Sequence, residues 1–158
     1  MSAKPPHLLL VEALFYEHIA ADLRRGAERA VADAGATCEI ISVPGSFEIP
    51  PAIAMAAKSG APYAGAPYDG YVALGCVIRG ETTHYDHICN ETARAMQELG
   101  SRDGLAVGFG ILTCENEAQA LVRASSATDK GGRDQGGRAV RACLALVELK
   151  RRFGEGRR

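Results

Sequence analysis

The hydrophobic residues of this chain change their periodicity repeatedly along the sequence, and this alternation limits the possible folds more than any other feature. Four short, nearly continuous apolar runs alternate with longer segments in which apolar residues recur every three or four positions. The first pattern is typical of a strand covered on both faces, and the second of an amphipathic helix. The predicted strands are residues 7–12, 37–43, 71–78 and 105–112, and the predicted helices are 17–34, 84–99, 116–123, one beginning near 46–51, and a last one ending near 153.

Glycine, proline and small polar residues mark the expected ends of these elements. Gly35 and Gly100 are predicted to end two helices, because glycine adopts the left-handed backbone that follows a helix. Ser46 is a plausible N-cap, and Asn116 with Gln119 three residues later resembles a capping box. The segments predicted to be connections are 60–70, at the surface, and 125–137, a loop or kink.

Strand and helix alternate along almost the whole chain, which predicts an α/β fold. The expected architecture is a three-layer αβα arrangement, with a four-stranded parallel flavodoxin-like sheet flanked by helices on both faces. Right-handed crossovers place the turns from strand to helix along one edge of that sheet. With 158 residues, 47% of them hydrophobic, and no internal repeat, residues 1–158 are expected to form a single domain.

Charge and cysteine content exclude several classes of protein. The formal net charge of −1 gives no reason to expect a nucleic-acid or membrane partner. The five cysteines include no C-x-x-C pair, and an odd count suits free thiols better than a disulfide framework. The N-terminal MSAKPPHLLLVEA lacks the long apolar core of a signal peptide, and no apolar run approaches eighteen residues. We therefore expect a cytoplasmic protein.

The turn after the third predicted strand almost spells a nucleotide-binding loop. Gly75 and Gly80 have the spacing of the P-loop glycines, but Glu81 occupies the position of its phosphate-pairing lysine. This carboxylate argues against ATP or GTP. Backbone amides at a helix start, beside the hydroxyls of Thr82 and Thr83, can still hold a single phosphate. The alternative, that the two threonines only cap the helix, stays open.

His84 lies in the first turn of the helix that follows, where it could reach a substrate held at the same end. An imidazole pKa of about 6.5 in model peptides suits proton transfer at neutral pH. A merely exposed or structural histidine is the alternative. His84 and His87 also have the spacing of a metal-chelating pair, but no third residue completes a known set of ligands, so no metal is predicted.

Three other residues have two possible interpretations each when considered alone. Phe15 could stack on a flat heterocycle or belong to the core. Glu48 could complement a helix dipole or accept hydrogen bonds from a polyol. Arg123 could be a solvated cation at a helix end or a phosphate ligand. The segment around Ser46 lacks the G-x-S-x-G of a nucleophile elbow, which disfavours a serine hydrolase.

Three blocks of sequence together closely resemble lumazine synthase, an enzyme family of riboflavin biosynthesis. The blocks are VPGSFEIP (43–50), ALGCVIRGETTHYDHICNE (73–91) and FGILTCENEAQALVRA (109–124). Their order and spacing also agree with the family, so the resemblance covers nearly the whole chain. It implies condensation of 5-amino-6-(D-ribitylamino)uracil with 3,4-dihydroxy-2-butanone 4-phosphate, giving 6,7-dimethyl-8-ribityllumazine, phosphate and water. The implied chemistry uses no metal or organic cofactor.

The resemblance also implies roles for individual positions. It implies that His84 transfers protons and that Phe15 stacks on the pyrimidine ring. The other substrate-binding residues it implies are Ser46, Phe47 and Glu48 on the ribityl side, Cys76, Val77 and Ile78 at the pyrimidine, Glu81 and Thr82 in the phosphate turn, Arg123 at the phosphate, and Phe109 as an apolar wall from a neighbouring subunit. The implied assembly is a homopentamer with active sites between adjacent subunits.

The chain departs from the family pattern at three places. Glu81 is a carboxylate where many members have a small residue, so its side chain is expected to point away from the phosphate. Gln135 stands where members usually have a lysine, and Lys130 is the residue that might replace it. The segment between Arg123 and Gly136 is longer than in members that form capsids. We expect this segment to obstruct a larger shell and to leave a free homopentamer.

Two other functions fit parts of the same pattern. A divergent paralogue would bind flavins or lumazines without making them, but the presence of His84 and Arg123 favours the enzyme. An archaeal-type riboflavin synthase would use two lumazines and no phosphorylated ketone. The phosphate turn and Arg123 argue against that second alternative.

Overall fold

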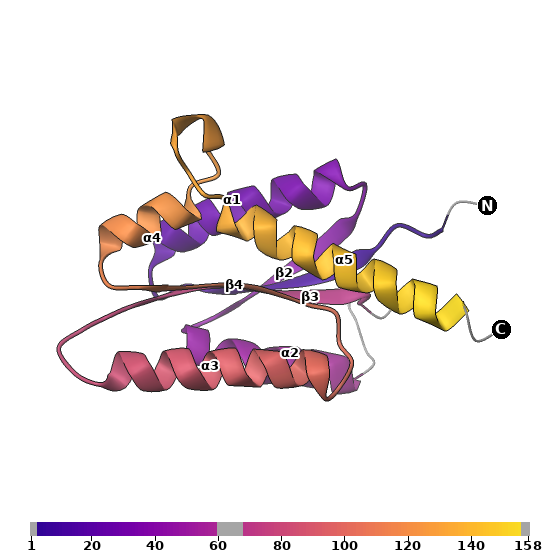
Figure 1. Cartoon of the computed structure of the whole chain (residues 1–158), viewed down its shortest axis with the longest axis horizontal. Coiled ribbons are helices and arrows are strands. Elements are labelled where there is room, and N and C mark those ends of the chain that lie inside the picture. Colours follow the sequence, from indigo (N-terminus) through magenta and orange to yellow (C-terminus); the bar gives the residue numbers. More distant parts are fainter. Residues whose placement is uncertain (1–2, 60–67, 156–158) are drawn as a thin grey trace.

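The structure, a computed structural model, describes residues 3–59 and 68–155, and a sheet of four parallel strands forms its centre (Figure 1). The order across the sheet is β2-β1-β3-β4, which is the order of flavodoxin-like sheets. The predicted parallel sheet is therefore confirmed. Residues 60–67 of the predicted surface connection lie outside the described residues. The strands are β1 (His7–Ala13), β2 (Thr37–Val43), β3 (Gly70–Ile78) and β4 (Val107–Cys114).

Helices cover both faces of this sheet and form the predicted three layers. Figure 1 shows α1, α4 and α5 on one face and α2 and α3 on the other. None of the helices within 3–59 and 68–155 is long and apolar enough to cross a membrane. The elements are α1 (Glu17–Asp33), α2 (Ile49–Ser59), α3 (His84–Ser101), α4 (Glu117–Ala124), α5 (Gln135–Glu155) and the short 3-10 turns η1 (Ser46–Glu48) and η3 (Thr128–Lys130).

Strand β1 shows why the predicted strands are continuous apolar runs. Leu8 and Leu10 belong to the core that α1, α4 and α5 cover, and Leu9 and Val11 belong to the core that α2 and α3 cover. All four side chains are buried. Because a central strand of an αβα sandwich has no solvent face, its sequence has no polar alternation.

The fourth strand lies two residues later than predicted, at Val107–Cys114. The Leu105 N–H donates a hydrogen bond to the Leu99 carbonyl oxygen at 3.1 Å, so Leu105 belongs to the turn that closes α3. At the other end, Cys114 still pairs with Ile78 of β3. The apolar run begins before the ladder of hydrogen bonds does, and this caused the shift in the prediction.

Of three predicted helix ends, one needs correction and two are confirmed. Gly100 does not end α3, which continues through Ser101; the left-handed residue comes at Gly104, with φ of 69°. Gly35, with φ of 67°, follows the end of α1 as predicted. The Asn116 side chain caps α4 by accepting a hydrogen bond from the backbone N–H of Gln119 at 2.9 Å.

The cysteines are free thiols, as predicted from their number and spacing. Cys76, Cys114 and Cys143 are buried, and burial is the main cause that raises the pKa of each thiol. They are therefore neutral, core-filling side chains at neutral pH.

Candidate active site

A crevice of about 540 Å³ opens at the carboxyl ends of β1, β2 and β3. Strand β1 lies between β2 and β3. The chain leaves β1 for α1 and β3 for α3, and these two helices pack on opposite faces of the sheet. Ligand sites of open α/β sheets form at such switch points. The predicted convergence of turns is thus confirmed for the first three strands. The crevice is lined by Phe15, Tyr16, Gly45, Ser46, Phe47, Glu48, Cys76, Val77, Ile78, Gly80, Thr82, His84, Tyr85 and Ile88.

Two aromatic side chains of the crevice are unusually exposed. Phe15, after β1, is 73% exposed, and Phe47, after β2, is 55% exposed. The Tyr16 ring supports Phe15 edge-on, with ring centroids 4.9 Å apart. A hydrogen bond of 3.0 Å from the Leu14 N–H to the Val43 carbonyl oxygen fixes the chain just before Phe15. Exposed aromatic faces beside a crevice suit stacking on a flat ligand.

The segment after β2 presents a carboxylate with a fixed position. The Glu48 carboxylate accepts a hydrogen bond of 3.1 Å from the Gly45 N–H, and the Glu48 N–H donates to the Gly45 carbonyl oxygen at 3.2 Å. Ser46 is therefore not the predicted N-cap: Gly45 precedes the turn, and the buried Ser46 hydroxyl has no hydrogen-bond partner. This hydroxyl fills the space above Gly75, where a Cβ atom would lie 2.6 Å from it.

The turn from β3 to α3 leaves a set of backbone amides unpaired. Within the described part of the chain, the N–H groups of residues 80–83 donate to no protein atom. The Thr82 hydroxyl accepts from the His84 N–H at 3.2 Å, whereas Thr83 makes no side-chain cap. Unpaired amides at the start of an eighteen-residue helix favour an anion, because the helix dipole adds to their partial positive charge.

The first turn of α3 brings titratable groups to the same crevice. His84 is exposed beside the unpaired amides, and Tyr85 and Ile88 line the wall behind it. Burial is the main cause that raises the pKa of Tyr85, so its phenol keeps its proton at neutral pH. Burial also raises the pKa of Cys76 to about 12, which makes this thiol an apolar wall and not a nucleophile.

Three of the predicted site residues do not line this crevice. Glu81 is exposed and lies outside its wall. Arg123, on α4, donates a hydrogen bond to the Gln119 carbonyl oxygen at 3.0 Å. Phe109, on β4, is 45% exposed and contributes to a different hollow.

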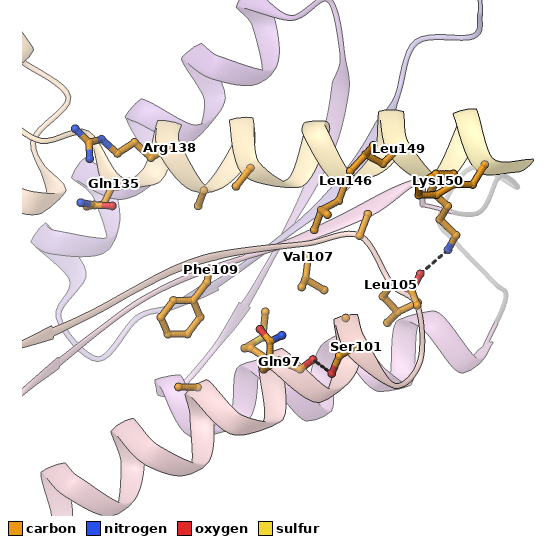
Figure 2. A pocket seen from close by; sticks show the side chains of 18 of the residues that line it. Gln97, Ser101, Leu105, Val107, Phe109, Gln135, Arg138, Leu146, Leu149 and Lys150 are labelled. Atoms are coloured by element: carbon orange, nitrogen blue, oxygen red, sulfur yellow. Dashed lines mark hydrogen bonds between the residues drawn. The ribbon is translucent and has the colours of Figure 1, made fainter.

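The second hollow lies along the free edge of the sheet and has a volume of about 1130 Å³ (Figure 2). Strand β4 is its floor, and α3 and α5 are its sides. Figure 2 shows Phe109 pointing from β4 toward α3, with Leu146 and Leu149 of α5 above the same groove. Leu146, Leu149 and Phe153 are exposed hydrophobic residues. An uncovered edge strand beside an apolar groove is the usual place for another chain to bind.

Some crevice residues were not predicted from sequence. Tyr16 and Tyr85 each follow a residue that was predicted, Phe15 and His84 respectively, and each lies in or next to the first turn of a helix. Ile88 is four residues after His84 and so shares its helix face. Proximity to a strand-to-helix turn was the signal that would have found these three.

The crevice thus combines a flat aromatic surface, a fixed carboxylate, unpaired amides and an imidazole. No group of three His, Cys, Asp or Glu side chains suited to a metal ion occurs among residues 3–59 and 68–155. The arrangement can hold a planar heterocycle at one end and an anion at the other. The His84 side chain lines the anion end.

Comparison with known proteins agrees with this geometry. A sequence model of the 6,7-dimethyl-8-ribityllumazine synthase family matches residues 5–151. The chain is 52% identical to 6,7-dimethyl-8-ribityllumazine synthase 1 of Rhizobium meliloti (strain 1021) over 151 residues, covering 96% of this chain and 95% of that protein. It is 50% identical to the 6,7-dimethyl-8-ribityllumazine synthase of Agrobacterium fabrum (strain C58) over 149 residues, covering 94% and 97%. The chain therefore belongs to the 6,7-dimethyl-8-ribityllumazine synthase family.

Proposed function

We propose that this chain catalyses the penultimate step of riboflavin biosynthesis, the condensation of 5-amino-6-(D-ribitylamino)uracil with 3,4-dihydroxy-2-butanone 4-phosphate. The products are 6,7-dimethyl-8-ribityllumazine, phosphate and water. The observation that carries the proposal is one crevice, in a chain of this family, with an aromatic surface at one end and an amide-lined turn at the other. These two ends suit the two substrates.

The aromatic end of the crevice suits the ribitylaminouracil. The Phe15 ring is free to stack on the pyrimidine, with Val77 and Ile78 lining the pocket beside it. The Glu48 carboxylate, which the Gly45 N–H holds in place, can accept hydrogen bonds from ribityl hydroxyl groups. Ser46, Phe47 and Cys76 complete this part of the wall.

The turn at residues 80–83 suits the phosphate of the ketone. Its unpaired amides and the Thr82 hydroxyl supply the hydrogen bonds, and Arg123 of a neighbouring subunit supplies the cation. Glu81 takes part through its backbone N–H, since its side chain lies outside the crevice. His84 lies at the same end and moves protons as the amine attacks the ketone, phosphate leaves and the ring closes.

No step of this chemistry requires a cofactor, because binding the two substrates in the correct orientation supplies much of the acceleration. The amine of the uracil attacks the carbonyl carbon, and the elimination of phosphate and water drives the reaction forward. Each of these steps needs a proton donor or acceptor near the ketone. His84 is that group.

We further propose a homopentamer with active sites between adjacent subunits. In a single chain, Phe109 lies in the groove between α3 and α5, outside the crevice that contains Phe15 and His84. A ring of copies, each placing its crevice on the β4 edge of the next, would bring Phe109 to the crevice of its neighbour. The same contact would cover the exposed side chains of Leu146 and Leu149.

The pentamer is proposed to stay free and not to build a larger shell. Between α4 and α5, residues 125–134 form an excursion that includes η3 and stands out from the helical layer (Figure 1). Lys130, proposed to replace the family's lysine, is exposed within this excursion. A light-scattering mass in the megadalton range would contradict the free pentamer.

Two broader properties of the chain are also proposed. We propose that residues 1–158 form a single domain, because all described helices pack on one sheet. We also propose that the enzyme works in the cytoplasm. The five free thiols support a reducing compartment.

The function is tested by a steady-state assay with both substrates, following lumazine absorbance and phosphate release together. The proposal requires equal amounts of lumazine and phosphate, above the spontaneous rate of the two compounds without protein. A Phe15→Ala protein serves as the matched control, since it lacks the stacking surface but keeps the phosphate turn. A wild-type rate no higher than the spontaneous rate would contradict the proposed function.

A further inference from the structure

Arg79 connects the end of strand β3 to the phosphate turn. It follows Ile78 directly and precedes Gly80. The Arg79 N–H donates a hydrogen bond of 2.9 Å to the Cys114 carbonyl oxygen, which extends the pairing of β3 with β4 by one bond. The backbone on the near side of the turn is thus held by the sheet.

The Arg79 side chain crosses to the far side of the same turn. Its Nη2 donates to the Asp86 carboxylate at 3.3 Å, and its guanidinium carbon lies 4.3 Å from the centre of the Tyr85 ring. Both partners belong to the first turn of α3, next to His84. Its Nε donates to the Glu115 carboxylate at 2.7 Å, which connects the turn to the segment between β4 and α4.

Few hydrogen bonds within the described chain hold the shape of the turn itself. Residues 80–83 are exposed, and their N–H groups donate to no atom of the described chain. Within the described chain they accept three hydrogen bonds, one by the Thr82 hydroxyl from the His84 N–H and two by the Thr83 carbonyl oxygen from the N–H groups of Asp86 and His87. A loop that must present several unpaired amides needs its two ends fixed from outside.

We propose that Arg79 is a positioning residue that fixes the two ends of the phosphate turn. Its backbone holds the start of the turn on the sheet, and its guanidinium holds the first turn of α3 through Asp86 and Tyr85. The Glu115 carboxylate holds the guanidinium itself in place. Arg79 does not line the crevice and acts through these partners. The inference rests on the proposed function of this turn in binding the phosphorylated ketone.

A simple charge effect makes a different prediction. If Arg79 only supplied positive charge near the phosphate, a lysine at the same position would do equally well. Removal of the negative Glu115 would then improve binding of the anion. If Arg79 instead holds the turn, a lysine cannot contact both carboxylates while lying flat on Tyr85. Removal of Glu115 would then weaken binding, because the guanidinium loses its anchor.

The experiment uses the full chain with Arg79→Gln, Arg79→Lys and Glu115→Ala, and measures KM for each substrate, kcat, and the binding of inorganic phosphate by calorimetry. We expect Arg79→Gln to raise KM for the phosphorylated ketone roughly tenfold, the size of effect that losing charge-assisted hydrogen bonds produces. The KM for ribitylaminouracil should change less than about twofold, since that end of the crevice is untouched. Arg79→Lys and Glu115→Ala should change the ketone KM in the same direction.

Arg25→Gln is the matched control. Arg25 is an exposed arginine with a carboxylate partner, Asp22 at 2.7 Å, but it lies on α1 away from the crevice. Its loss should leave both KM values unchanged. Exposed ion pairs stabilise a fold only slightly, so the thermal midpoints of Arg79→Gln and Arg25→Gln should be similar.

Three results would overturn the inference. The first is an unchanged ketone KM in Arg79→Gln. The second is a normal ketone KM in Arg79→Lys or a lower one in Glu115→Ala, which would indicate charge alone. The third is an equal rise of both KM values with a lowered thermal midpoint, which would indicate a general structural role. Phosphate binding separates these failures from a failure of the proposed function. A wild type that binds phosphate but forms no lumazine contradicts the proposed function. In that case the phosphate affinities of the variants still test the role of Arg79.

Discussion

The packing of Ser46 against Gly75 gives the sharpest prediction about stability. A Cβ atom added at Gly75 would lie 2.6 Å from the Ser46 Oγ, 3.2 Å from the Ile49 Cδ1 and 3.5 Å from the Ala13 Cβ. Gly75 does not have a positive φ, so the cost of Gly75→Ala is steric and not conformational. The serious clash is the one with Ser46, because the Ile49 atom is the end of a side chain that can move.

The expected changes in the free energy of unfolding follow from the two residues of this contact, Gly75 and Ser46. Overpacking of a filled core site costs about 1–3 kcal/mol, so we expect Gly75→Ala to lower the free energy of unfolding by about 2 kcal/mol. The Ser46 hydroxyl is buried without a hydrogen-bond partner. Ser46→Ala should therefore be neutral or stabilise by about 1 kcal/mol. In the Ser46→Ala background, the cost of Gly75→Ala should fall to about 0.5 kcal/mol, because the clashing oxygen is absent.

The assay is a double-mutant cycle by urea unfolding, at one fixed protein concentration because an oligomer gains stability from assembly. The predicted coupling between the two positions is about 1.5 kcal/mol. Additive effects, with Gly75→Ala equally costly in both backgrounds to within about 0.5 kcal/mol, would refute the packing argument. A strongly destabilising Ser46→Ala would refute the claim that the hydroxyl is unpaired.

Three further predictions concern catalysis and pH. His84→Ala should lower kcat about a hundredfold or more while the affinity for inorganic phosphate stays within about threefold, as measured by turnover and calorimetry; normal turnover would contradict the role of His84. Arg123→Ala should raise KM for the phosphorylated ketone about tenfold and leave KM for ribitylaminouracil unchanged, and an equal effect on both substrates would argue against a phosphate contact. Burial raises the pKa of the Cys76 and Cys143 thiols from about 9 to about 12, so the folded state binds these protons more tightly than the unfolded state. Their contribution to stability is complete below pH 9 and is lost as the pH rises toward 12, by about 1 kcal/mol per pH unit for each thiol. Urea unfolding between pH 8 and 10 should show a smaller loss in Cys143→Ala than in the wild type, and equal losses would contradict this.

The sequence predicted the fold well because each element has its own local pattern. The buried strand β1 is a continuous apolar run, and α1 has a helical repeat that ends at Gly35. Errors occurred where non-local contacts set the boundary. Leu105 belongs to the end of α3 because of its bond to Leu99, and no property of Leu105 itself indicates this.

The site shows the same difference between features set by local sequence and features set by non-local contacts. Phe15, Glu48 and His84 were predicted because each lies at a strand-to-helix turn, and parallel topology brings such turns together. The contacts of Arg79 were not predicted, because Glu115 is 36 residues away in sequence. The two residues meet only because β3 pairs with β4. The position of Phe109 likewise depends on β4 being the free edge, which is a property of the whole sheet.

The central claim, that an active site is shared by two subunits, is tested most directly by mixing two impaired proteins. Activity is assayed with the phosphorylated ketone below its wild-type KM, where both variants are slow. His84→Ala and Arg123→Ala chains are unfolded together and reassembled at equal ratio. If His84 and Arg123 of one site come from neighbouring chains of a ring, about a quarter of the sites in mixed oligomers contain both native residues. A shared site predicts that lumazine formation recovers to about that fraction of the wild-type rate. Activity of the mixture no greater than the mean of the two separate proteins would contradict it.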